Sequence, residues 1–386
     1  MISGSTSDPQ HVSNMSDYSD VPVHAKPVGT FVSLYAGAGG MDIGFSLAGF
    51  APVWVSELDS AALSTHDAAF KQLASERPHL NNLEYESHVG DILAVPAADL
   101  PTKGSADLVI GGPPCQGFSV AGKMDPHDER SKHVFHFMDI VERVQPKAFV
   151  LENVKALYQN RRWSAIRDGL RNRAEQLGYD TILTLANASH FGVPQARERM
   201  FLIGIKKGEG VPAPLVATTA STPPTVRQAL SQLPSYGEVG NDSKCTAKIT
   251  LAKAPVLRRS QYAGMLFNGA GRPLNLDAPS ITLAASMGGN KTPIVDQAIL
   301  TNPERDSWVT DYHANLWTRE ELQALPAIPS SLRRLTVEEA AAIQTFPLGM
   351  HWSGPQSARF RQIGNAVPPR LAMAAAESVK KSLGLD

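Results

Sequence analysis

The sequence predicts an α/β protein with a mostly parallel sheet covered by helices on both faces, together with a smaller and irregular second domain. Two observations predict this fold. From about Gly29 to Gly204, short apolar runs alternate with stretches that have helical spacing. After Lys207 this alternation fades, and Pro, Ala, Ser and Thr crowd residues 212–224. In a parallel sheet of this kind, functional groups gather at the carboxyl ends of the strands.

Each expected element can be placed in chain order. Five apolar runs have the length of buried strands, and they span residues 31–37, 52–58, 107–112, 148–154 and 200–205. Helical spacing marks residues 41–47, 61–73, 134–144 and 164–177. Near the carboxyl end, TVEEAAAIQTF and residues 371–383 have a helical pattern, and the turn-rich RQIGNAVPPR lies between them.

These patterns divide the chain into four parts. Residues 1–27 are polar and rich in Ser, Asp and His, which predicts a loose, disordered tail. Residues 28–206 form the sheet domain and residues 207–330 the irregular domain. Regular structure returns in residues 331–386.

The composition is that of a soluble globular protein, with 42% hydrophobic and 19% charged residues. No apolar run approaches the roughly 20 residues that a membrane span requires, so a membrane protein is excluded. The first 27 residues lack the basic and apolar regions of a signal peptide, which favours the cytoplasm. The two cysteines, Cys115 and Cys245, are therefore expected as free thiols.

The distribution of charge leaves two interpretations open. The net charge of −1 neither supports nor excludes a polyanionic partner. Locally, however, residues 244–291 carry seven Lys and Arg against the single acidic Asp277. This stretch is either a basic face that binds nucleic acid or a solvated, lysine-rich loop region.

The stretch FVSLYAGAGGMDIGF predicts a cradle for a small ligand. A strand runs into Gly37 and Gly39 and then into a helix, so that bare backbone can approach a ligand. A tight structural turn is the alternative, because Asp42 stands where the third glycine of a dinucleotide motif would be. Glu57 ends the next strand, where an acidic side chain commonly holds ribose hydroxyls. Asp91 could accept from an adenine amino group or be a lone surface aspartate.

The loop GGPPCQGFS, residues 111–119, places Cys115 after a buried strand. A free cysteine is usually a small buried apolar residue. Here the prolines fix the backbone and the glycines allow close packing at the functional edge of the sheet, which favours a nucleophilic thiol. Cys245 has no such setting and is structural or incidental.

Two further strands bring charged side chains to the same edge. Glu152 and Asn153 follow an apolar run, where partial burial would raise the pKa of the carboxyl group and suit it to proton donation. A helix-capping carboxylate is the alternative. Gln195, Arg197 and Arg199 alternate, so a strand would point all three the same way. They could hold a phosphate or a base oxygen, or form structural ion pairs.

Taken in order, these motifs resemble those of the DNA (cytosine-5) methyltransferases of the bacterial modification type. The resemblance covers residues 30–205 and 333–371, and GGPPCQGFS and QIGNAVPP are specific by themselves. It implies a Rossmann-like sheet that uses S-adenosyl-L-methionine, formed by residues 28–206 and completed by residues 331–386. Residues 207–330 would then be the target-recognition domain.

The resemblance also implies a role for individual residues, and no metal is expected among them. Catalysis would rest on Cys115, Glu152, Arg197 and Arg199. The cofactor would be lined by Tyr35, Gly37, Gly39, Glu57, Leu58, Asp91 and Asn365. The substrate would be contacted by Gln116, Ser119, Asn153, Gln195, Thr282 and Leu283.

The chain departs from the family pattern at four positions. Ser33 stands where the first motif usually has Asp, and Tyr35 replaces the usual Phe. DERSKHVFHF keeps the first Asp and the Arg of the family's DxRN pattern, but Ser131 and His133 replace the usual Asn and Leu. These changes bear on the shape of the site around the methionine end of the cofactor.

The implied reaction explains the thiol. Attack by Cys115 on carbon 6 of a flipped-out cytosine makes carbon 5 reactive toward the methyl group. Glu152 would act at ring nitrogen 3, and Arg199 would hold the base oxygen. The expected partner is double-stranded DNA, with a restriction endonuclease acting separately or none at all. A cytoplasmic, nucleoid-associated monomer is expected.

Three rival functions fit parts of the sequence. A related group methylates tRNA, but its usual Cys-Phe-Thr tripeptide does not occur in the middle region. A catalytically silent recognition subunit would normally have lost Cys115 or Glu152, and both are present. An NAD-dependent oxidoreductase is disfavoured by the broken glycine pattern and leaves the PPCQ loop unexplained.

Overall fold

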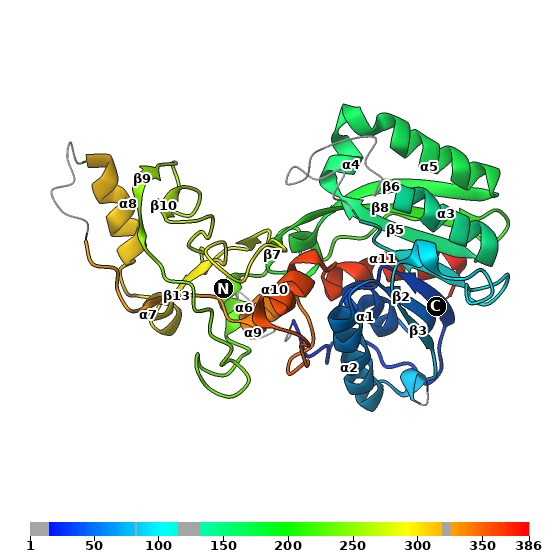
Figure 1. Cartoon of the computed structure of the whole chain (residues 1–386), viewed down its shortest axis with the longest axis horizontal. Helices are drawn as coiled ribbons and strands as arrows, with labels where there is room; N and C mark the ends of the chain where they lie inside the picture. Colours follow the sequence, from blue (N-terminus) through cyan, green and yellow to red (C-terminus); the bar gives the residue numbers. More distant parts are fainter. Residues whose placement is uncertain (1–14, 82, 115–131, 319–325, 386) are drawn as a thin grey trace, which may run out of the picture.

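The computed structural model describes residues 15–81, 83–114, 132–318 and 326–385. Its centre is a seven-stranded sheet in the order β3-β2-β1-β4-β5-β8-β6 (Figure 1). Strands β3 through β5 are parallel, and β8 runs antiparallel between β5 and β6. The prediction of a mostly parallel sheet is confirmed. The strands are β1 (Gly29–Leu34), β2 (Phe50–Glu57), β3 (Glu86–Val89), β4 (Leu108–Gly111), β5 (Ala148–Val154), β6 (Tyr179–Asn187) and β8 (Glu198–Lys206).

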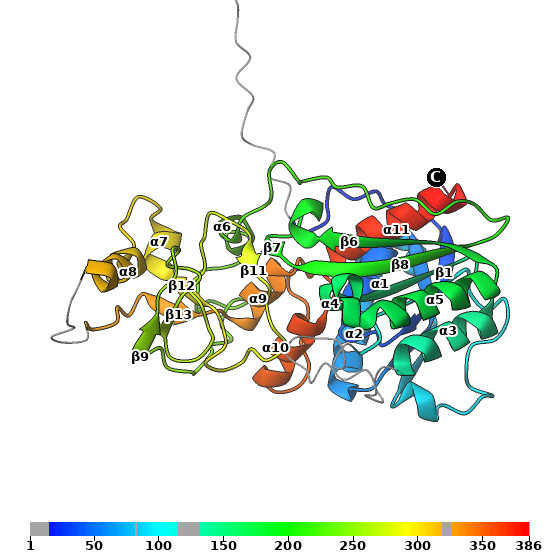
Figure 2. The ribbon, with the colours of Figure 1, turned by 90° about the horizontal axis from the view of Figure 1, so that it is seen from above.

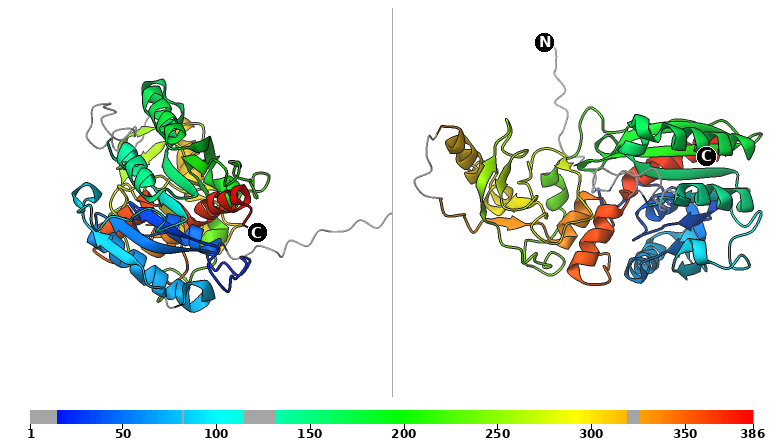
Figure 3. Two further views of the ribbon diagram at one scale, coloured as in Figure 1. Left: turned by 90° about the vertical axis from the view of Figure 1, so that its right-hand side faces the viewer. Right: turned by 45° about the horizontal axis from the view of Figure 1, so that its top comes forward.

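Helices cover both faces of the sheet (Figure 3). Successive strand residues point to opposite faces, so Phe31 packs on one side and Val32 on the other. One face is covered by α1 (Gly40–Leu47), α2 (Ser60–Glu76) and α11 (Pro369–Leu383). The other face is covered by α3 (Lys132–Val144), α4 (Lys155–Gln159) and α5 (Ser164–Gln176). The result is a three-layer sandwich.

The expected elements of this domain are all present, and the sheet has two further strands, β3 and β6, that were not among the five apolar runs. Strand β6 has the sequence YDTILTLAN and lies at the end of the sheet. Its five central residues are only half-buried, because a neighbouring strand covers one edge alone. A half-buried edge strand lacks the continuous apolar run that marked the central strands.

The amino-terminal segment differs from its prediction. Residues 1–14 lie outside the described residues, but the chain packs against the sheet domain from Met15 onward. Met15, Tyr18 and Val21 are buried. Arg370 donates from Nε to the Met15 carbonyl at 2.7 Å, and Arg77 donates from Nη2 to the Tyr18 carbonyl at 2.8 Å. The segment from Met15 onward is therefore ordered, although its polar composition predicted a disordered tail. Buried apolar side chains three residues apart and hydrogen bonds from two arginines hold it in place.

A small lobe, formed by the described residues 249–318 and 326–334, lies beside the sheet domain (Figure 2). It contains the hairpin of β9 (Leu251–Val256) and β10 (Met265–Phe267), the strand β12 (Ile294–Asp296), and the helices α7 (Gln297–Thr301) and α8 (Trp308–Thr318). Its own core consists of Leu251, Leu266, Phe267, Ile294, Val309, Tyr312 and Leu332. The lobe is irregular, as the sequence predicted.

The boundaries of this lobe differ from the expected 207–330. Residues 207–219 still follow the sheet domain, where Ala213 donates its N–H to the Ser382 hydroxyl at 3.0 Å. At the other end, β13 (Leu332–Arg334) pairs with β12 and belongs to the lobe. The first boundary of the lobe is therefore set by a hydrogen-bonded extended segment, and the second by the pairing of two strands. Composition alone gives no signal of either contact.

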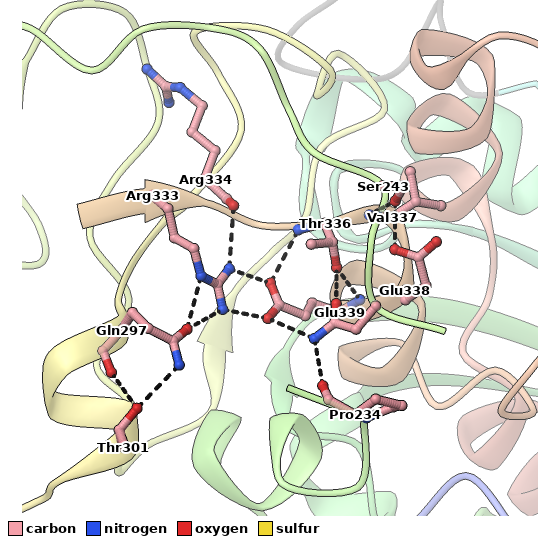
Figure 4. Close-up of polar contacts among 11 residues, drawn as sticks. Pro234, Ser243, Gln297, Thr301, Arg333, Arg334, Thr336, Val337, Glu338 and Glu339 are labelled. Atoms are coloured by element: carbon pink, nitrogen blue, oxygen red, sulfur yellow. Dashed lines mark hydrogen bonds and ion pairs between the residues drawn. The ribbon is translucent and has the colours of Figure 1, made fainter. Parts of the chain in front are cut away.

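The junction between the two parts contains a buried ion pair (Figure 4). The side chain of Arg333, on β13, forms two hydrogen bonds, of 2.6 and 2.7 Å, with Glu339 of α9 (Val337–Ile343). The same guanidinium donates to Gln297 of α7 at 2.7 and 2.9 Å and lies 4.1 Å from the ring centre of Tyr236. One cation thus joins the small lobe to the sheet domain. Among the described residues, no helix has both the length and the apolar character needed to cross a membrane.

Candidate active site

The turn between β1 and α1 has the conformation of a ligand cradle. Tyr35, Gly37 and Gly39 have φ angles of 59°, 59° and 85°, in the left-handed region. Gly37 donates its N–H to Glu57 Oε2 at 2.8 Å, which ties the turn to the end of β2. A Cβ atom on Gly39 would lie 2.8 Å from Cδ2 of His66, so only glycine fits there.

Glu57, Leu58 and Asp91 lie along the carboxyl edge of the sheet beside this turn. Glu57 also accepts the N–H of Asp59 at 2.9 Å, and burial raises the pKa of its carboxyl group. Leu58 is 70% exposed, and Asp91 is exposed with Oδ1 accepting from Leu93 N at 3.0 Å. The Gly90 N–H donates to the Glu57 carbonyl at 2.9 Å, so the ends of β2 and β3 are adjacent.

The carboxyl-terminal motif RQIGNAVPPR packs directly against the glycine-rich turn. A Cβ on Gly40 would lie 2.2 Å from the Val367 carbonyl oxygen, and one on Gly44 would lie 2.5 Å from that of Pro369. Asn365 ends α10 (Gln356–Asn365) at this contact. Two motifs more than 300 residues apart therefore form one surface, because small residues let their backbones touch.

These residues fit an adenosine-containing cofactor. The turn presents backbone at positions where a side chain cannot be accommodated, and a carboxylate follows at the end of each of the next two strands. This is the arrangement in which parallel sheets bind a ribose and a base.

Glu152 lies at the carboxyl end of β5 and is 8% exposed. Arg199 approaches it from β8, with Nε 2.9 Å from Oε1. Burial raises the pKa of Glu152, and the charges of Arg199 and Arg197 oppose that shift. A buried carboxyl group whose affinity for a proton is raised is suited to donating one.

The chain leading to the predicted nucleophile reaches the same place. A Cβ on Gly112 would lie 2.9 Å from Glu152 Oε2, and Asn153 donates from Nδ2 to the Pro113 carbonyl at 3.0 Å. The second glycine of GGPP is thus required by the close approach of Glu152. Cys115, Gln116 and Ser119 lie outside the described residues, as do Asp128, Arg130 and Ser131.

Gln195, Arg197 and Leu283 form the junction with the small lobe. The short strands β7 (Gln195–Ala196) and β11 (Ser280–Ile281) pair in parallel. Gln195 Oε1 accepts from Leu283 N at 3.1 Å, and Arg197 Nη1 donates to the Leu283 carbonyl at 3.3 Å. Thr282 donates to the Ala196 carbonyl at 3.0 Å.

The burial of these residues changes the roles expected for them. Gln195 and Leu283 are fully buried and Arg197 is 1% exposed. Arg197 also donates from Nη2 to the Gly364 carbonyl at 3.0 Å and to that of Asn365 at 3.4 Å. In this structure Gln195 and Leu283 hold the lobe in place. Their contact with a substrate stays a prediction. Of the three alternating residues, Arg199 lies beside Glu152, with 2.9 Å between Nε and Oε1. Arg197 lies between β7 and β8 and is turned to the carbonyls of Gly364 and Asn365.

Two of the departures from the family pattern meet in space. The Tyr35 hydroxyl lies 3.1 Å from Nδ1 of His133, and the two rings stand edge to face with 5.5 Å between their centres. Burial and the charge of Asp91 raise the pKa of Tyr35, which keeps its hydroxyl protonated. The polar side chains of Tyr35 and His133 therefore form a hydrogen bond with each other.

The sequence interpretation missed His66. It lies on the buried face of α2 and contacts Asp42, whose position in the motif was noted but not explained. A single histidine in an amphipathic helix carries no local signal of such a contact, so it could not be identified without the fold.

Comparison with known proteins settles the family. Residues 29–381 match the model of the C-5 cytosine-specific DNA methylase family. The chain belongs to this family. It is 32% identical over 356 residues to the type II methyltransferase M1.HphI of Haemophilus parahaemolyticus, covering 91% of this chain and 87% of the relative. It is 30% identical over 381 residues to the type II methyltransferase M.XorII of Xanthomonas oryzae, covering 93% and 85%.

The fold agrees with this assignment. The structure of the S. pombe Dnmt2 methyltransferase superposes with a TM-score of 0.60 at 16% identity, covering 92% of this chain and 99% of that one. The chain is thus a DNA (cytosine-5) methyltransferase with a Rossmann-like fold, and the expectations for family, fold and enzyme class are confirmed. Its family implies methylation that depends on S-adenosyl-L-methionine.

Proposed function

We propose that this methyltransferase modifies carbon 5 of a cytosine flipped out of a specific duplex DNA sequence, through a transient bond between Cys115 and carbon 6. The observation that carries the proposal is the buried Glu152–Arg199 pair. It lies against Gly112, three residues before Cys115, at the same edge of the sheet as the glycine-rich turn.

The cofactor site would be formed by the turn and the strand ends beside it. Glu57 would bind the ribose hydroxyls, Asp91 the adenine amino group, and Leu58 one face of the base. Tyr35, Gly37 and Gly39 would surround the ligand with their backbone, and Asn365 would close the site from α10. When bound, S-adenosyl-L-methionine supplies an electrophilic methyl group.

The residues around Glu152 would act on the target base. The Cys115 thiolate forms a bond to carbon 6, and the electron pair of the 5,6 double bond becomes available at carbon 5. Glu152 donates a proton or hydrogen bond to ring nitrogen 3, which offsets the charge that arrives there. After methylation a base removes the carbon 5 proton, the bond to sulfur breaks, and the thiolate is restored.

Arg199 and Arg197 would have separate tasks. Arg199 is 14% exposed in its side chain, so it can hold the cytosine oxygen while keeping its ion pair with Glu152. Arg197 is buried and binds the carbonyls of Gly364 and Asn365. It would act on catalysis through its charge near Glu152 and by fixing Asn365.

The small lobe would recognise the DNA sequence. Lys and Arg on its surface would bind phosphates, and polar side chains would read base edges in the major groove. Asn153 and Thr282, together with Gln116 and Ser119, would contact the flipped nucleotide and its neighbours. Flipping costs a few kcal/mol, which these contacts must offset.

The relatives support the biological setting that we propose. Both similar proteins named above carry the designation type II methyltransferase. We assign this chain to DNA modification as a monomer in the cytoplasm, associated with the nucleoid, either beside a separate restriction endonuclease or as an orphan enzyme.

Bisulfite sequencing of plasmid DNA from cells that express the protein tests the proposal. The wild-type protein should protect cytosine at one recurrent sequence, and Cys115→Ala should protect none. Protection by Cys115→Ala at the wild-type level would contradict the covalent mechanism. Protected tRNA with unprotected plasmid would favour the rival RNA substrate.

A duplex with 5-fluorocytosine at the recurrent site identifies the nucleophile. Fluorine at carbon 5 cannot be removed as a cation, so the adduct should persist on Cys115 in the presence of cofactor. Mass spectrometry of the digested protein should place the adduct on the peptide that contains GGPPCQGFS. An adduct on another peptide would overturn the assignment.

A further inference from the structure

A chain of buried polar groups runs beneath the glycine-rich turn. Ser33 on β1 donates to Asp42 Oδ1 at 2.8 Å, and Asp42 Oδ2 lies 3.0 Å from Nε2 of His66. Nδ1 of His66 lies 3.2 Å from Asp67 Oδ1, which also accepts from the Tyr85 hydroxyl at 2.8 Å. The side chains of His66 and Asp42 are 0% and 1% exposed. This cluster connects β1, α1, α2 and the segment before β3.

The geometry favours an imidazolium at His66, since Nδ1 lies closer to Asp67 Oδ1, at 3.2 Å, than to the Tyr85 hydroxyl, at 3.4 Å. Both ring nitrogens face a carboxylate oxygen, and a neutral imidazole carries only one N–H. The Tyr85 proton is engaged with Asp67, so it does not serve the second nitrogen. Both contacts are hydrogen bonds only when the ring carries two protons, and the ring is then a buried cation between two acidic side chains.

The ring also supports the turn directly. A Cβ on Gly39 would be 2.8 Å from His66 Cδ2, so the ring packs against the backbone of Gly39. Gly39 precedes α1, and its carbonyl accepts the Ile43 N–H at 2.8 Å. Asp42 lies in the first turn of the same helix. His66 therefore holds the turn at two points, through packing on Gly39 and through the hydrogen bond to Asp42.

We propose that His66 is a positioning residue: as an imidazolium shared by Asp42 and Asp67, it fixes the glycine-rich turn in the shape that receives the cofactor. The proposal rests on the proposed function of that turn. If the cofactor holds the turn in this shape, the bound protein should retain the second ring proton more strongly than the free protein. Cofactor affinity should then fall at alkaline pH.

The groups that face the ring set the pH range. Asp42 comes from α1, Asp67 from α2, and Tyr85 from the segment before β3, while Phe70 stacks on the ring with 4.5 Å between centres. Burial lowers the pKa of His66, but the hydrogen bonds and charges of the two carboxylates together outweigh it and raise the pKa to about 9. The stabilisation is therefore complete below the ordinary histidine value and is lost as the pH rises through about 9.

The outer end of the cluster gives the proton a route to solvent. The Asp67 side chain is 36% exposed, and with Tyr85 and Lys71 it helps to line an open surface groove. Asp67 lies outside the turn, so it can be changed without altering a residue that would touch the cofactor.

Nuclear magnetic resonance of the full-length protein with ¹⁵N-labelled histidine tests the charge. Without ligand, the His66 nitrogens should show the imidazolium signature at pH 8 and titrate near 9. Adding S-adenosylhomocysteine, the demethylated cofactor, should move the midpoint upward. A midpoint near 6.5, or one that ligand does not move, would overturn the proposal.

Ligand affinity measured by calorimetry from pH 6 to 10 gives the second readout. A midpoint difference of one pH unit between free and bound protein corresponds to roughly a tenfold loss of affinity at high pH. Asp67→Asn removes one carboxylate charge and should move the alkaline fall to lower pH, with affinity unchanged at pH 6. His66→Gln should bind weakly and without this fall.

Controls separate this proposal from the proposed function. The amino group of the ligand itself titrates in the alkaline range. Its effect on affinity is the same for every variant, so the test compares the variants with one another. His351→Gln alters an exposed histidine and should reproduce the wild-type curve. Binding that is the same in wild type and Asp67→Asn at every pH would refute the role of His66. No binding at any pH would instead refute the cofactor site itself, and the inference with it.

Discussion

The sheet domain and the small lobe are held together by different kinds of contact. The sheet domain has two extended apolar cores, one on each face of seven strands, and its functional motifs contact one another through glycine backbone. The small lobe has a core of seven buried residues and short strands of two to six residues. At the junction, buried apolar residues of the lobe such as Leu274, Leu283 and Val295 join the core on one face of the sheet domain. Arg333 and Arg197 add polar contacts there.

If the small lobe recognises the target as proposed, this difference lets the chemistry stay constant while the target changes. The proposed catalytic residues Glu152 and Arg199 lie on β5 and β8, which are paired along their length within the sheet. The core of the lobe itself is separate from these strands, so its sequence can vary there without disturbing them. The predictions below test this contrast, beginning with the largest expected effect.

Changing Glu152 should abolish most catalysis without affecting the fold. Glu152→Gln keeps the shape of the side chain but removes its acidic proton, so the methylation rate should fall by about 10²–10⁴-fold. Thermal unfolding should change little, because the amide can still accept from Arg199. Single-turnover assays with ³H-labelled cofactor measure the rate.

The matched control is Glu198→Gln. Glu198 lies on β8, the strand beside that of Glu152, and pairs at 2.6 Å with Lys155, the first residue of α4. Both side chains are 38% exposed. Such a pair contributes little, so the rate should stay within about twofold of wild type. An equal loss in both variants would mean that the strands, rather than the carboxyl group, had been disturbed.

Breaking the Arg333–Glu339 pair should loosen the small lobe selectively. Arg333→Gln leaves a carboxylate that is 1% exposed without its partner, which typically costs about 3–5 kcal/mol. Hydrogen exchange should quicken in β12 and β13, while the central strands β1 and β4 remain protected. The KM for DNA should rise more than the dissociation constant of the cofactor.

Arg361→Gln provides the comparison for that variant. Arg361 pairs with Asp59 at 2.9 Å on the surface, with its side chain 53% exposed. Its loss should cost at most about 1 kcal/mol. Uniformly faster exchange across both parts in Arg333→Gln would show that the lobe and the sheet domain unfold as one unit.

Replacing a glycine by alanine should destabilise the sheet domain but not the small lobe. In Gly44→Ala the new Cβ would meet the Pro369 carbonyl and the Ala372 methyl group at 2.5 Å, which overpacks the contact between α1 and α11. Such overpacking typically costs about 1–3 kcal/mol. Gly289→Ala in the small lobe meets nothing within 4 Å and should leave stability unchanged. Urea unfolding of both variants measures the difference, and equal destabilisation would contradict it.

The sequence predicted the sheet domain well because its signals are local. Central strands such as β5 are continuous apolar runs, and Glu152 follows one directly. Long-range contacts left no such signal. The placement of His66 against Asp42, the pairing of β7 with β11, and the packing of Tyr18 against the return segment all join residues distant in sequence. The sequence also gave no sign that Gln195 and Leu283 would be fully buried and hydrogen-bonded to each other where the small lobe meets the sheet domain.

The smallest expected effect concerns single cations on the small lobe. Lys253 is exposed on β9, within the basic stretch that composition alone left open between a DNA-binding face and a solvated loop. If the lobe binds phosphates, Lys253→Ala should weaken DNA binding by a few-fold and reduce the slope of log affinity against log salt by about 0.9. Fluorescence anisotropy with a labelled duplex at several salt concentrations measures both quantities. Lys207→Ala, an exposed cation just after β8, should leave the slope unchanged because it lies outside the lobe. Equal slopes in all three proteins would assign the basic stretch to solvent and leave DNA recognition to other side chains of the lobe.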